Sequence, residues 1–448
     1  MLAWYVFQLS IWCGFLFHPI GTGSVSTAPG TVLSVQLVLQ EGDIPAGIAG
    51  LAVTQIRSPF TDGTGKVGFT GTLSDGMNTD GFVWYDSGIV FVNSSVMFMS
   101  GGESTMGVGN LGQFIFSPAI GADDTVWTHN GLLLSESDPA PGFAAPATIT
   151  FCSRPQMQPS GQSSWVSGLD LTGVGFTQAR VLYRSPTSSA GDVIRVLASG
   201  DLVDGFAIAS PSGIDFDYHF SDNGMHLIAA LFMDTGVPAS DGFVYVDGVL
   251  VARESEPTGQ GDHWNTFSNV TINRFGNYLF SGDTNGAVTE DEFIAFNAQI
   301  GLREGDLLDG VLLSSPATVQ ALSINNRNQS VFIWGLSADE HLFYASQAGH
   351  LAGSRRILST GDFVDVTGDG VADAMVTDLN ASTIVGPGLD FADNGMLFLS
   401  VDLDYSMGSL DAVIGLDLFA ICPQLNDQLP IWPDTWDVID LLHFICMP

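Results

Sequence analysis

The sequence has very few positively charged residues. A single lysine, Lys66, stands beside eleven arginines, against 48 Asp and Glu residues, and the formal net charge is −36. A nucleic-acid-binding protein needs a basic surface for the phosphates, so this balance argues against that class. Hydrophobic residues make up 45% of the 448 residues, which argues against intrinsic disorder.

Long apolar runs are also missing, except at the start of the chain. Residues 2–17 are almost all apolar, and small residues follow at 21–26. This pattern is typical of a secretory signal peptide, predicted here over 1–26, and it predicts a secreted, extracellular or cell-surface protein without a transmembrane helix after its removal. The cationic n-region is absent, so a misassigned start, a retained anchor and a buried strand stay open as alternatives.

Cysteine is scarce, with four residues in the chain. Cys13 belongs to the predicted signal peptide, and Cys152 in an apolar stretch is expected to be a small buried side chain. Cys422 and Cys446 bracket the final segment, and we predict a disulfide between them in an oxidising compartment. No cysteine spacing indicates a metal site.

Catalytic motifs are absent from the sequence. The eight histidines form no H-E-x-x-H pair, and neither a phosphate-binding loop nor a nucleophile elbow occurs. His219 has acids nearby at Asp215, Asp217 and Asp222. We assign no catalytic residues and expect a binding or structural module. The alternative is a carbohydrate-active hydrolase or lyase, whose carboxylate pair the sequence cannot reveal among so many acids.

Glycine, by contrast, is abundant, and it marks an internal repeat of a polar turn followed by an apolar strand. The marker residues, about 55 residues apart on average, are Gly65, Gly112, Gly161, Gly224, Gly276, Asn328 and Gly395. Four positions after each marker stands a large apolar residue: Phe69, Phe116, Trp165, Ile228, Phe280, Phe332 and Leu399. A left-handed hairpin corner favours Gly and then Asn, and the next strand must bury one bulky side chain.

A second repeated element is a tight acidic turn before each marker. Its acids are Asp43, Glu103, Asp138, Asp201, Glu256, Asp306 and Asp362. The structural interpretation is that each side chain caps its turn by bonding the backbone two residues later. The alternative is an acidic rim at the mouth of a central channel, open to cations or basic partners.

The repeat length suits about four strands, which is the size of a propeller blade. We predict an all-β, seven-bladed β-propeller over residues 31–420. Pairing of residues 34–40 with 410–418 would close the ring and leave no edge strand exposed. An open stack or solenoid is the alternative.

The repeats resemble those of secreted bacterial "choice-of-anchor" and domain-of-unknown-function proteins. Gly42-Asp43-Ile44-Pro45 and Ser137-Asp138-Pro139-Ala140-Pro141-Gly142 are similar to the G-D-x-x-P-G turn of those proteins, which alternates with an N-x-x-G-x-h-x-F strand. The resemblance covers about 390 residues and implies an extracellular, propeller-like protein without an assigned activity.

One loop has the spacing of a calcium site. Its predicted ligands are Asp365, Thr367, Asp369, Val371 through its carbonyl group, and Asp373, with Gly370 at the turn position. The bidentate glutamate at position 12 is missing, since Val376 stands there. We predict bound Ca²⁺; the alternative is an Asp–Gly turn held by side-chain to backbone hydrogen bonds.

Residues 421–448 break the repeat. Within them, residues 435–446 are predicted to form an amphipathic helix capped by Asp434. Its apolar face holds Val438, Leu441, Leu442 and Ile445. This tail resembles a degenerate dockerin module, and the alternative is a terminal helix that covers a propeller face. The partner class we expect is an extracellular glycan or a surface protein. No nucleic acid is expected.

Overall fold

The computed structural model describes residues 32–48, 50–93, 96–97, 106–120, 123–175, 177–210, 217–337, 339–379, 388–405 and 408–422. The predicted signal peptide and the predicted helix over 435–446, which includes Cys446, lie outside these ranges. The unit that starts at Val32 consists almost wholly of β-strands. Its described helices are short: η1 (Ala190–Asp192), η2 (Pro238–Ser240), η3 (Leu351–Gly353) and α1 (Leu418–Ile421).

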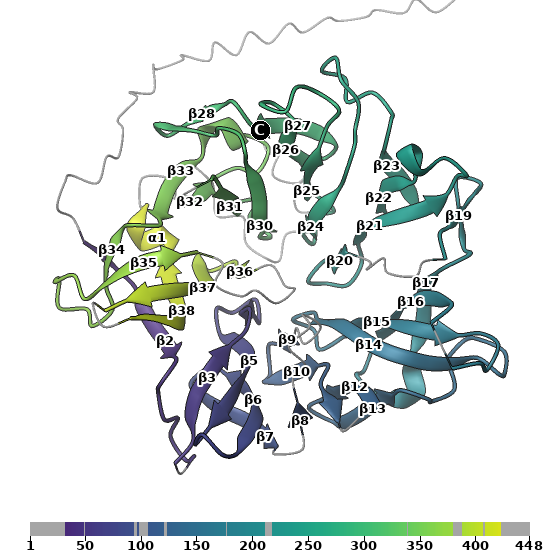
Figure 1. Cartoon of the computed structure of the whole chain (residues 1–448), viewed down its shortest axis with the longest axis horizontal. Helices are drawn as coiled ribbons and strands as arrows, with labels where there is room; N and C mark the ends of the chain where they lie inside the picture. The colour runs from purple at the N-terminus through teal and green to yellow at the C-terminus, as the bar shows by residue number, and fades with distance from the viewer. Residues whose placement is uncertain are drawn as a thin grey trace, which may run out of the picture. The chain divides into compact units, whose positions relative to one another are not determined.

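Six blades are each built from one continuous segment, and neighbouring strands in a blade are antiparallel (Figure 1). The first contains β3 (Ala52–Ile56), β4 (Phe60–Thr61), β5 (Val67–Ser74), β6 (Thr79–Tyr85) and β7 (Gly88–Asn93). The second contains β8 (Val96–Met97), β9 (Met106–Gly109), β10 (Gln113–Phe116), β11 (Ala119–Ile120), β12 (Asp123–Thr128) and β13 (Gly131–Ser135). The third contains β14 (Thr148–Met157), β15 (Ser163–Asp170), β16 (Ala179–Ser185) and β17 (Ile194–Ala198).

The other three continuous blades follow the same order. The fourth contains β18 (Leu202–Val203), β19 (Phe206–Ile208), β20 (Asp217–Phe220), β21 (Leu227–Asp234), β22 (Gly242–Val246) and β23 (Val249–Arg253). The fifth contains β24 (Ser268–Ile272), β25 (Tyr278–Asp283), β26 (Glu292–Phe296) and β27 (Gln299–Arg303). After the ribbon β28 (Leu307–Leu308) and β29 (Val311–Leu312), the sixth contains β30 (Thr318–Ile324), β31 (Ser330–Gly335), β32 (Glu340–Ala345) and β33 (Arg355–Ser359).

The remaining sheet is composite, because it draws strands from both ends of the described chain. It contains β34 (Phe363–Asp365), β35 (Ala374–Asp378), β36 (Leu389–Phe391), β37 (Met396–Asp404) and β38 (Ser409–Asp417), joined by β1 (Leu33–Ser34) and β2 (Gln36–Gln40). Leu37 pairs with Ile414 and Gln40 with Ala412, so the predicted closing contact forms. The predicted seven-bladed propeller is corrected to six blades of continuous chain. The seventh repeat instead forms this composite sheet, in which β1 and β2 of the N-terminal side pair with strands of the C-terminal side.

The marker residues form the hairpins that leave the inner strand of each sheet. All seven have positive φ angles: Gly65 (90°), Gly112 (74°), Gly161 (83°), Gly224 (62°), Gly276 (77°), Asn328 (61°) and Gly395 (90°). The bulky residues four positions later have no exposed surface: Phe69, Phe116, Trp165, Ile228, Phe280, Phe332 and Leu399. The predicted hairpin corners and buried side chains are therefore confirmed. We call the surface formed by these hairpin tips the hairpin face.

The core lies between neighbouring sheets. Trp165 packs with Val126 of the preceding blade, whereas the adjacent Val166 packs with Phe220 of the following blade. Since alternate residues of a strand point to opposite faces, each inner part of a sheet is buried on both sides. This explains the long apolar stretches in the strands. Each fully buried large side chain contributes about 1.5–3 kcal/mol.

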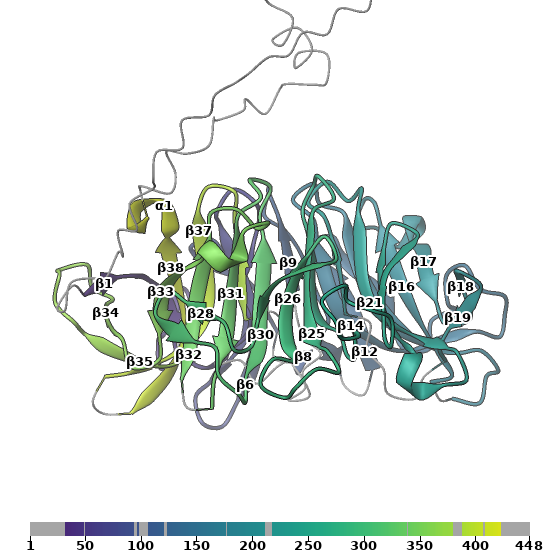
Figure 2. The same cartoon turned by 90° about the horizontal axis from the view of Figure 1, so that it is seen from above.

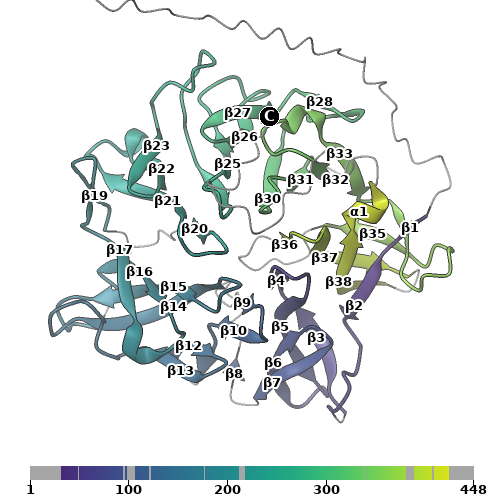
Figure 3. The same ribbon diagram turned by 180° about the vertical axis from the view of Figure 1, so that it is seen from behind.

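The inner strands contact one another in sequence order around a centre. β4 contacts β9, β9 contacts β14, and the series continues through β20, β24, β30 and β36 back to β4 (Figure 3). Gln156 Nε2 donates a 2.6 Å hydrogen bond to the carbonyl of Tyr218, which joins β14 to β20. These contacts exclude an open stack. In the described part of the chain, no helix is long and apolar enough to cross a membrane.

Candidate functional site

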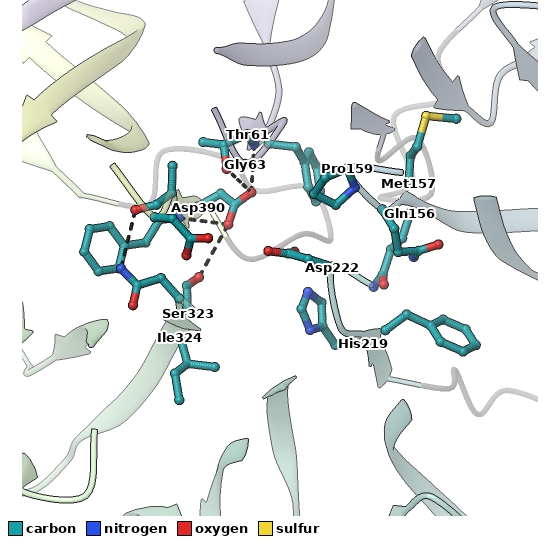
Figure 4. Close-up of a pocket in the computed structure, with 17 residues that line it drawn as sticks. Thr61, Gly63, Gln156, Met157, Pro159, His219, Asp222, Ser323, Ile324 and Asp390 are labelled. Atoms are coloured by element: carbon teal, nitrogen blue, oxygen red, sulfur yellow. Dashed lines mark hydrogen bonds between the residues drawn. The ribbon is translucent and has the colours of Figure 1, made fainter. Parts of the chain in front are cut away.

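A pocket lies where the inner strands meet, next to the hairpin face. It has a volume of about 70 Å³, which gives room for about five water-sized groups. We call it the axial pocket. Its lining residues come from five sheets: Phe60, Thr61, Gly63, Gln156, Met157, Gln158, Pro159, His219, Phe220, Asp222, Ser323, Ile324, Asn325, Asp390, Phe391, Ala392 and Asp393 (Figure 4).

Two carboxylates of the pocket share one amide donor. Asn326 Nδ2 lies 2.5 Å from Asp222 Oδ2 and 2.8 Å from Asp393 Oδ2. Because both distances meet at one nitrogen, the two carboxylate oxygens are no more than about 5.3 Å apart. Asp222, Asn326 and Asp393 each stand two positions before a marker residue, in three different sheets. The repeat thus brings residues that are distant in sequence to one place.

The environment of Asp222 disfavours its charged form. Burial, and then the nearby charge of Asp393, raise the pKa of Asp222 to about 6, although the hydrogen bond from Asn326 acts in the opposite direction. A carboxyl group with this pKa is mostly ionised at neutral pH and gains a proton in mildly acidic solution. The backbone N–H of Arg274 donates a 2.8 Å bond to Asn326 Oδ1, which holds the bridging amide in place.

Asp390 connects three inner strands deeper in the pocket. Its Oδ2 accepts hydrogen bonds from the backbone N–H (2.7 Å) and hydroxyl (3.1 Å) of Thr61. Its Oδ1 accepts from Ser323 Oγ at 3.4 Å and from the N–H of Phe391 at 2.8 Å. Burial raises the pKa of Asp390, and these donors counteract that rise. Asp390 thus connects β4, β30 and β36 through the hydrogen bonds of one carboxylate.

His219 supplies a donor on the opposite side of the pocket. Its Nδ1 accepts a 3.1 Å hydrogen bond from the N–H of Ile272. Burial lowers the pKa of His219 to about 4, so the ring is neutral at physiological pH. With Nδ1 as acceptor, the hydrogen of the neutral ring is on Nε2.

Two glutamines bring acceptors without donors. Gln158 is only 2% exposed, and among the described residues no donor bonds its Oε1. The buried Oε1 of Gln156 has no described donor either, whereas its Nε2 bonds Tyr218. An unsatisfied buried acceptor costs about 1–3 kcal/mol, and such groups therefore need a partner. The two buried side-chain atoms that line the pocket without a described partner are therefore both acceptors.

Residues 108–370 match a protein family of unknown function, DUF7453. The chain belongs to this family. No curated protein matches the chain. Among solved structures, prolyl oligopeptidase B from Galerina marginata matches with 11% identity and a TM-score of 0.42, over 80% of this chain and 50% of that chain. The chain thus spans about half the length of that peptidase. A gluconolactonase from Xanthomonas campestris matches with 14% identity and a TM-score of 0.30, over 67% of this chain and 94% of that chain.

In this DUF7453 chain, the predicted calcium loop connects β34 and β35. Asp365 Oδ1 accepts from the N–H of Gly368 at 2.6 Å, and its Oδ2 from that of Gly370 at 2.7 Å. Asp373 Oδ2 bonds the N–H and the hydroxyl of Thr367, both at 3.1 Å. Asp369 Oδ1 accepts from the N–H of Val371 at 2.9 Å. These contacts suit the Asp–Gly turn alternative.

Within the described ranges, no group of three or more His, Cys, Asp or Glu residues is placed to hold a metal ion. The calcium loop also supplies a threonine hydroxyl and a carbonyl group as predicted ligands, which lie outside that set. Calcium binding by Asp365, Thr367, Asp369, Val371 and Asp373 therefore stays a prediction.

The acidic turns follow the outer strands and not the axial pocket. In five of them, the carboxylate accepts the backbone N–H three residues earlier, at 2.7–3.0 Å: Asp43, Asp138, Asp201, Asp306 and Asp362. The structural interpretation holds, but the donor lies three residues before the acid and not two after it. Because β2, β13, β17, β27 and β33 precede these turns, their acids form no rim at the pocket. Glu103 lies outside the described residues.

The cysteines and the acids near His219 have separate positions. Cys152 is 2% exposed, as expected for a buried side chain, and burial raises its pKa to about 12. Cys422 is half-buried, and its predicted disulfide partner Cys446 lies outside the described residues. Asp222 joins His219 in the pocket, whereas Asp217 pairs with Arg154 at 3.4 Å. Asp215 is outside the described residues.

Sequence reasoning missed Gln158, Asn326, Asp390 and Asp393. The sequence did contain a signal for two of these residues. The position two before the marker holds Asp222, Asn326 and Asp393 in three of the repeats. The signal could be recognised only with the knowledge that this position faces the centre.

Proposed function

We propose that this protein is a ligand-binding β-propeller whose axial pocket takes a small cationic group rich in hydrogen-bond donors, such as an alkylammonium. The observation that carries the proposal is the pair of buried acceptors without described donors, the carbonyl oxygens of Gln156 and Gln158. Asp222 and Asp393 line the same pocket. An ammonium group supplies three donors and no acceptor, which complements this lining.

Charge favours the same class of ligand. Three carboxyl groups, those of Asp222, Asp390 and Asp393, line one small pocket, and its histidine is neutral. An entering cation would lower the repulsion between Asp222 and Asp393, and it would gain from the low dielectric of the site. The composite sheet contributes to this site as well, because its β36 and the turn after it supply Asp390 and Asp393.

The volume sets the size of the bound group. About five water-sized positions accommodate the end of a larger molecule and not a whole disaccharide. We therefore infer that the pocket recognises a charged terminus or substituent, while the rest of the ligand extends over the hairpin face.

A matched pair of sugars tests this proposal. Glucosamine carries an ammonium group and glucose does not, and their rings are otherwise alike. Saturation-transfer NMR at pH 7.4 should detect glucosamine and methylammonium on the protein. Gln158→Leu and Asp222→Asn should weaken the signals at least fivefold, and Asp201→Asn, in an outer turn, should leave them unchanged. Equal signals for glucose and glucosamine, or none for either ammonium compound, would overturn the proposal.

A second function, glycoside hydrolysis, is favoured by one observation. Asp222 and Asp393 both bond Asn326 Nδ2, so their carboxylate oxygens are close, at most about 5.3 Å apart. Retaining glycosidases likewise need two close carboxyl groups, about 5–5.5 Å apart. Asp222, with its raised pKa, would be the acid, and Asp393 the nucleophile. Release of nitrophenol from 4-nitrophenyl glycosides, abolished by either Asp222→Asn or Asp393→Asn, would support hydrolysis; unchanged release in both variants would dismiss it.

The proposal includes an extracellular location and a calcium-stabilised loop. The apolar residues 2–17 support secretion, and the spacing of Asp365, Asp369 and Asp373 supports calcium. The repeat and tail resemblances to choice-of-anchor and dockerin proteins support a surface-attached role. Fractionation of the native host into medium, surface and cell contents tests the location; recovery only from cell contents would contradict it.

A further inference from the structure

Apolar side chains project from the hairpin face, and no described residue covers them. Leu111 is 87%, Met225 75% and Phe275 61% exposed. All three stand next to a marker residue at a hairpin tip. Leu111 stands apart on the second blade, whereas Met225 and Phe275 stand on the neighbouring fourth and fifth blades, where adjacent exposed apolar side chains favour a docking surface.

Arginines accompany these apolar tips. The guanidinium carbon of Arg274 lies 4.9 Å from the ring centre of Phe275, and that of Arg327 lies 5.0 Å from the ring centre of Phe419. Basic residues are rare in this chain, at 12 of 448. One of them, Arg327, stands at a hairpin tip beside an aromatic ring, which favours a partner that is both apolar and acidic.

The described chain ends on this same face. Helix α1 is fixed there, since Leu418 is fully buried and its N–H bonds the carbonyl of Gly395 at 3.0 Å (Figure 2). The carboxylate of Asp417 caps the helix by accepting from the N–H groups of Phe419 and Ala420, each at 3.0 Å. The last described helix therefore lies beside Arg327, whose aromatic partner Phe419 belongs to it.

Residues 423–448 have the matching composition. They contain four aspartates and no lysine or arginine, and their apolar residues include Trp432, Trp436 and Phe444. A segment of this length spans roughly 39 Å even if it is wholly helical, which is enough to cross several hairpins. We propose that residues 423–448 dock on the hairpin face, with an aspartate at Arg327 and apolar side chains on Phe275 and Met225.

Hydrogen exchange decides the proposal, and no pocket ligand is needed. The full chain is compared with a variant that ends at Cys422. Amides of the hairpins around Phe275 and Arg327 should exchange at least fivefold more slowly in the full chain, whereas the outer β22–β23 turn should be unaffected. Equal exchange at those hairpins would overturn the proposal.

Charge reversal identifies the contact. Arg327→Glu in the full chain should remove most of the protection at the Phe275 hairpin, and Arg356→Glu on the outer strand β33 is the matched control. Equal effects of the two substitutions would contradict docking at Arg327.

If the shortened chain does not fold, the full-length double variant Trp436→Ser and Ile439→Ser replaces it, with the same expected loss of protection. A failed ligand test at the axial pocket would leave these results unaffected.

Discussion

Asn326 bonds Asp222 at 2.5 Å across the axis, although 104 residues separate the two in sequence. The same Asn326 nitrogen bonds Asp393, and the backbone of Arg274 bonds the Asn326 carbonyl oxygen. One amide thus joins the hairpins of four successive sheets. Hydrogen bonds to charged groups contribute about 1.5–3 kcal/mol each, so this side chain should be important for both the pocket and the closed ring.

Replacing the bridging amide should therefore be costly. We expect Asn326→Ala to lower the free energy of unfolding by roughly 2–4 kcal/mol at pH 7, because two carboxylates lose their shared donor and face each other. Urea unfolding followed by fluorescence measures the change. The deficit should become smaller at pH 4.5, where protonation relieves the repulsion.

A second hairpin asparagine provides the control. Asn394 is exposed and donates one hydrogen bond, to the carbonyl of Thr64 at 2.8 Å. Asn394→Ala should cost less than about 1 kcal/mol and show no pH dependence of its deficit. If the two alanine variants behave alike, the bridge between Asp222 and Asp393 has no special role.

The repeat in the sequence predicted much of the fold, because hairpin corners and buried strand positions impose strict local demands. Asn328 occupies a marker position with φ of 61°, a conformation that few residues other than Gly tolerate. The pocket could not be predicted in this way. Asp222, Asp390 and Asp393 are brought together by closure of the ring, which depends on the register of the inner strands. The position of Asp222 and Asp393 two residues before a marker does not by itself show that they face the centre.

Stability should fall as the pH rises above the acidic range. Burial, together with the hydrogen bond to Asp283, raises the pKa of Glu292 to about 9 from an ordinary value of 4.5. The folded state therefore holds a proton that the unfolded state releases, so the stabilisation is complete below about pH 4.5 and is lost as the pH rises towards 9. Asp402, raised to about 7 by burial and its partner Asp411, acts in the same direction. We expect a higher melting temperature at pH 5 than at pH 8.

Glu292→Gln should reduce this pH dependence. The amide stays neutral and can still accept the N–H of Val319, which bonds Glu292 at 2.6 Å. The variant should melt near the wild-type temperature at pH 5 and above it at pH 8 by differential scanning calorimetry. Glu256→Gln, in an outer turn, is the control. A wild-type melting temperature that rises from pH 5 to pH 8 would refute the assignment.

The contacts between blades predict that replacing Trp165 strongly lowers the free energy of unfolding. This side chain has no exposed surface and packs between two sheets, so Trp165→Ala should cost about 3–5 kcal/mol of unfolding free energy. Leu111 lies at a hairpin tip and is 87% exposed, so Leu111→Ala should change the unfolding free energy by less than about 0.5 kcal/mol. Urea denaturation measures both changes, provided that the slope of unfolding free energy against urea concentration (the m-value) is the same in all variants. Comparable losses would contradict the placement of the core.

Calcium provides the last prediction. Asp365 and Asp369 are predicted ligands, and their carboxylates already bond backbone N–H groups of the loop. A bound cation would use their remaining lone pairs and would stabilise the folded state according to its concentration and affinity. Calcium at 5 mM should raise the melting temperature by a few degrees above that in EDTA, and magnesium should do less because it demands a tighter octahedral shell.

Asp369→Asn together with Asp373→Asn should remove the calcium response, while Asp201→Asn in an outer turn should keep it. An equal calcium response in both variants would show that the ion acts elsewhere. No response in the wild type would identify the loop as an Asp–Gly turn alone.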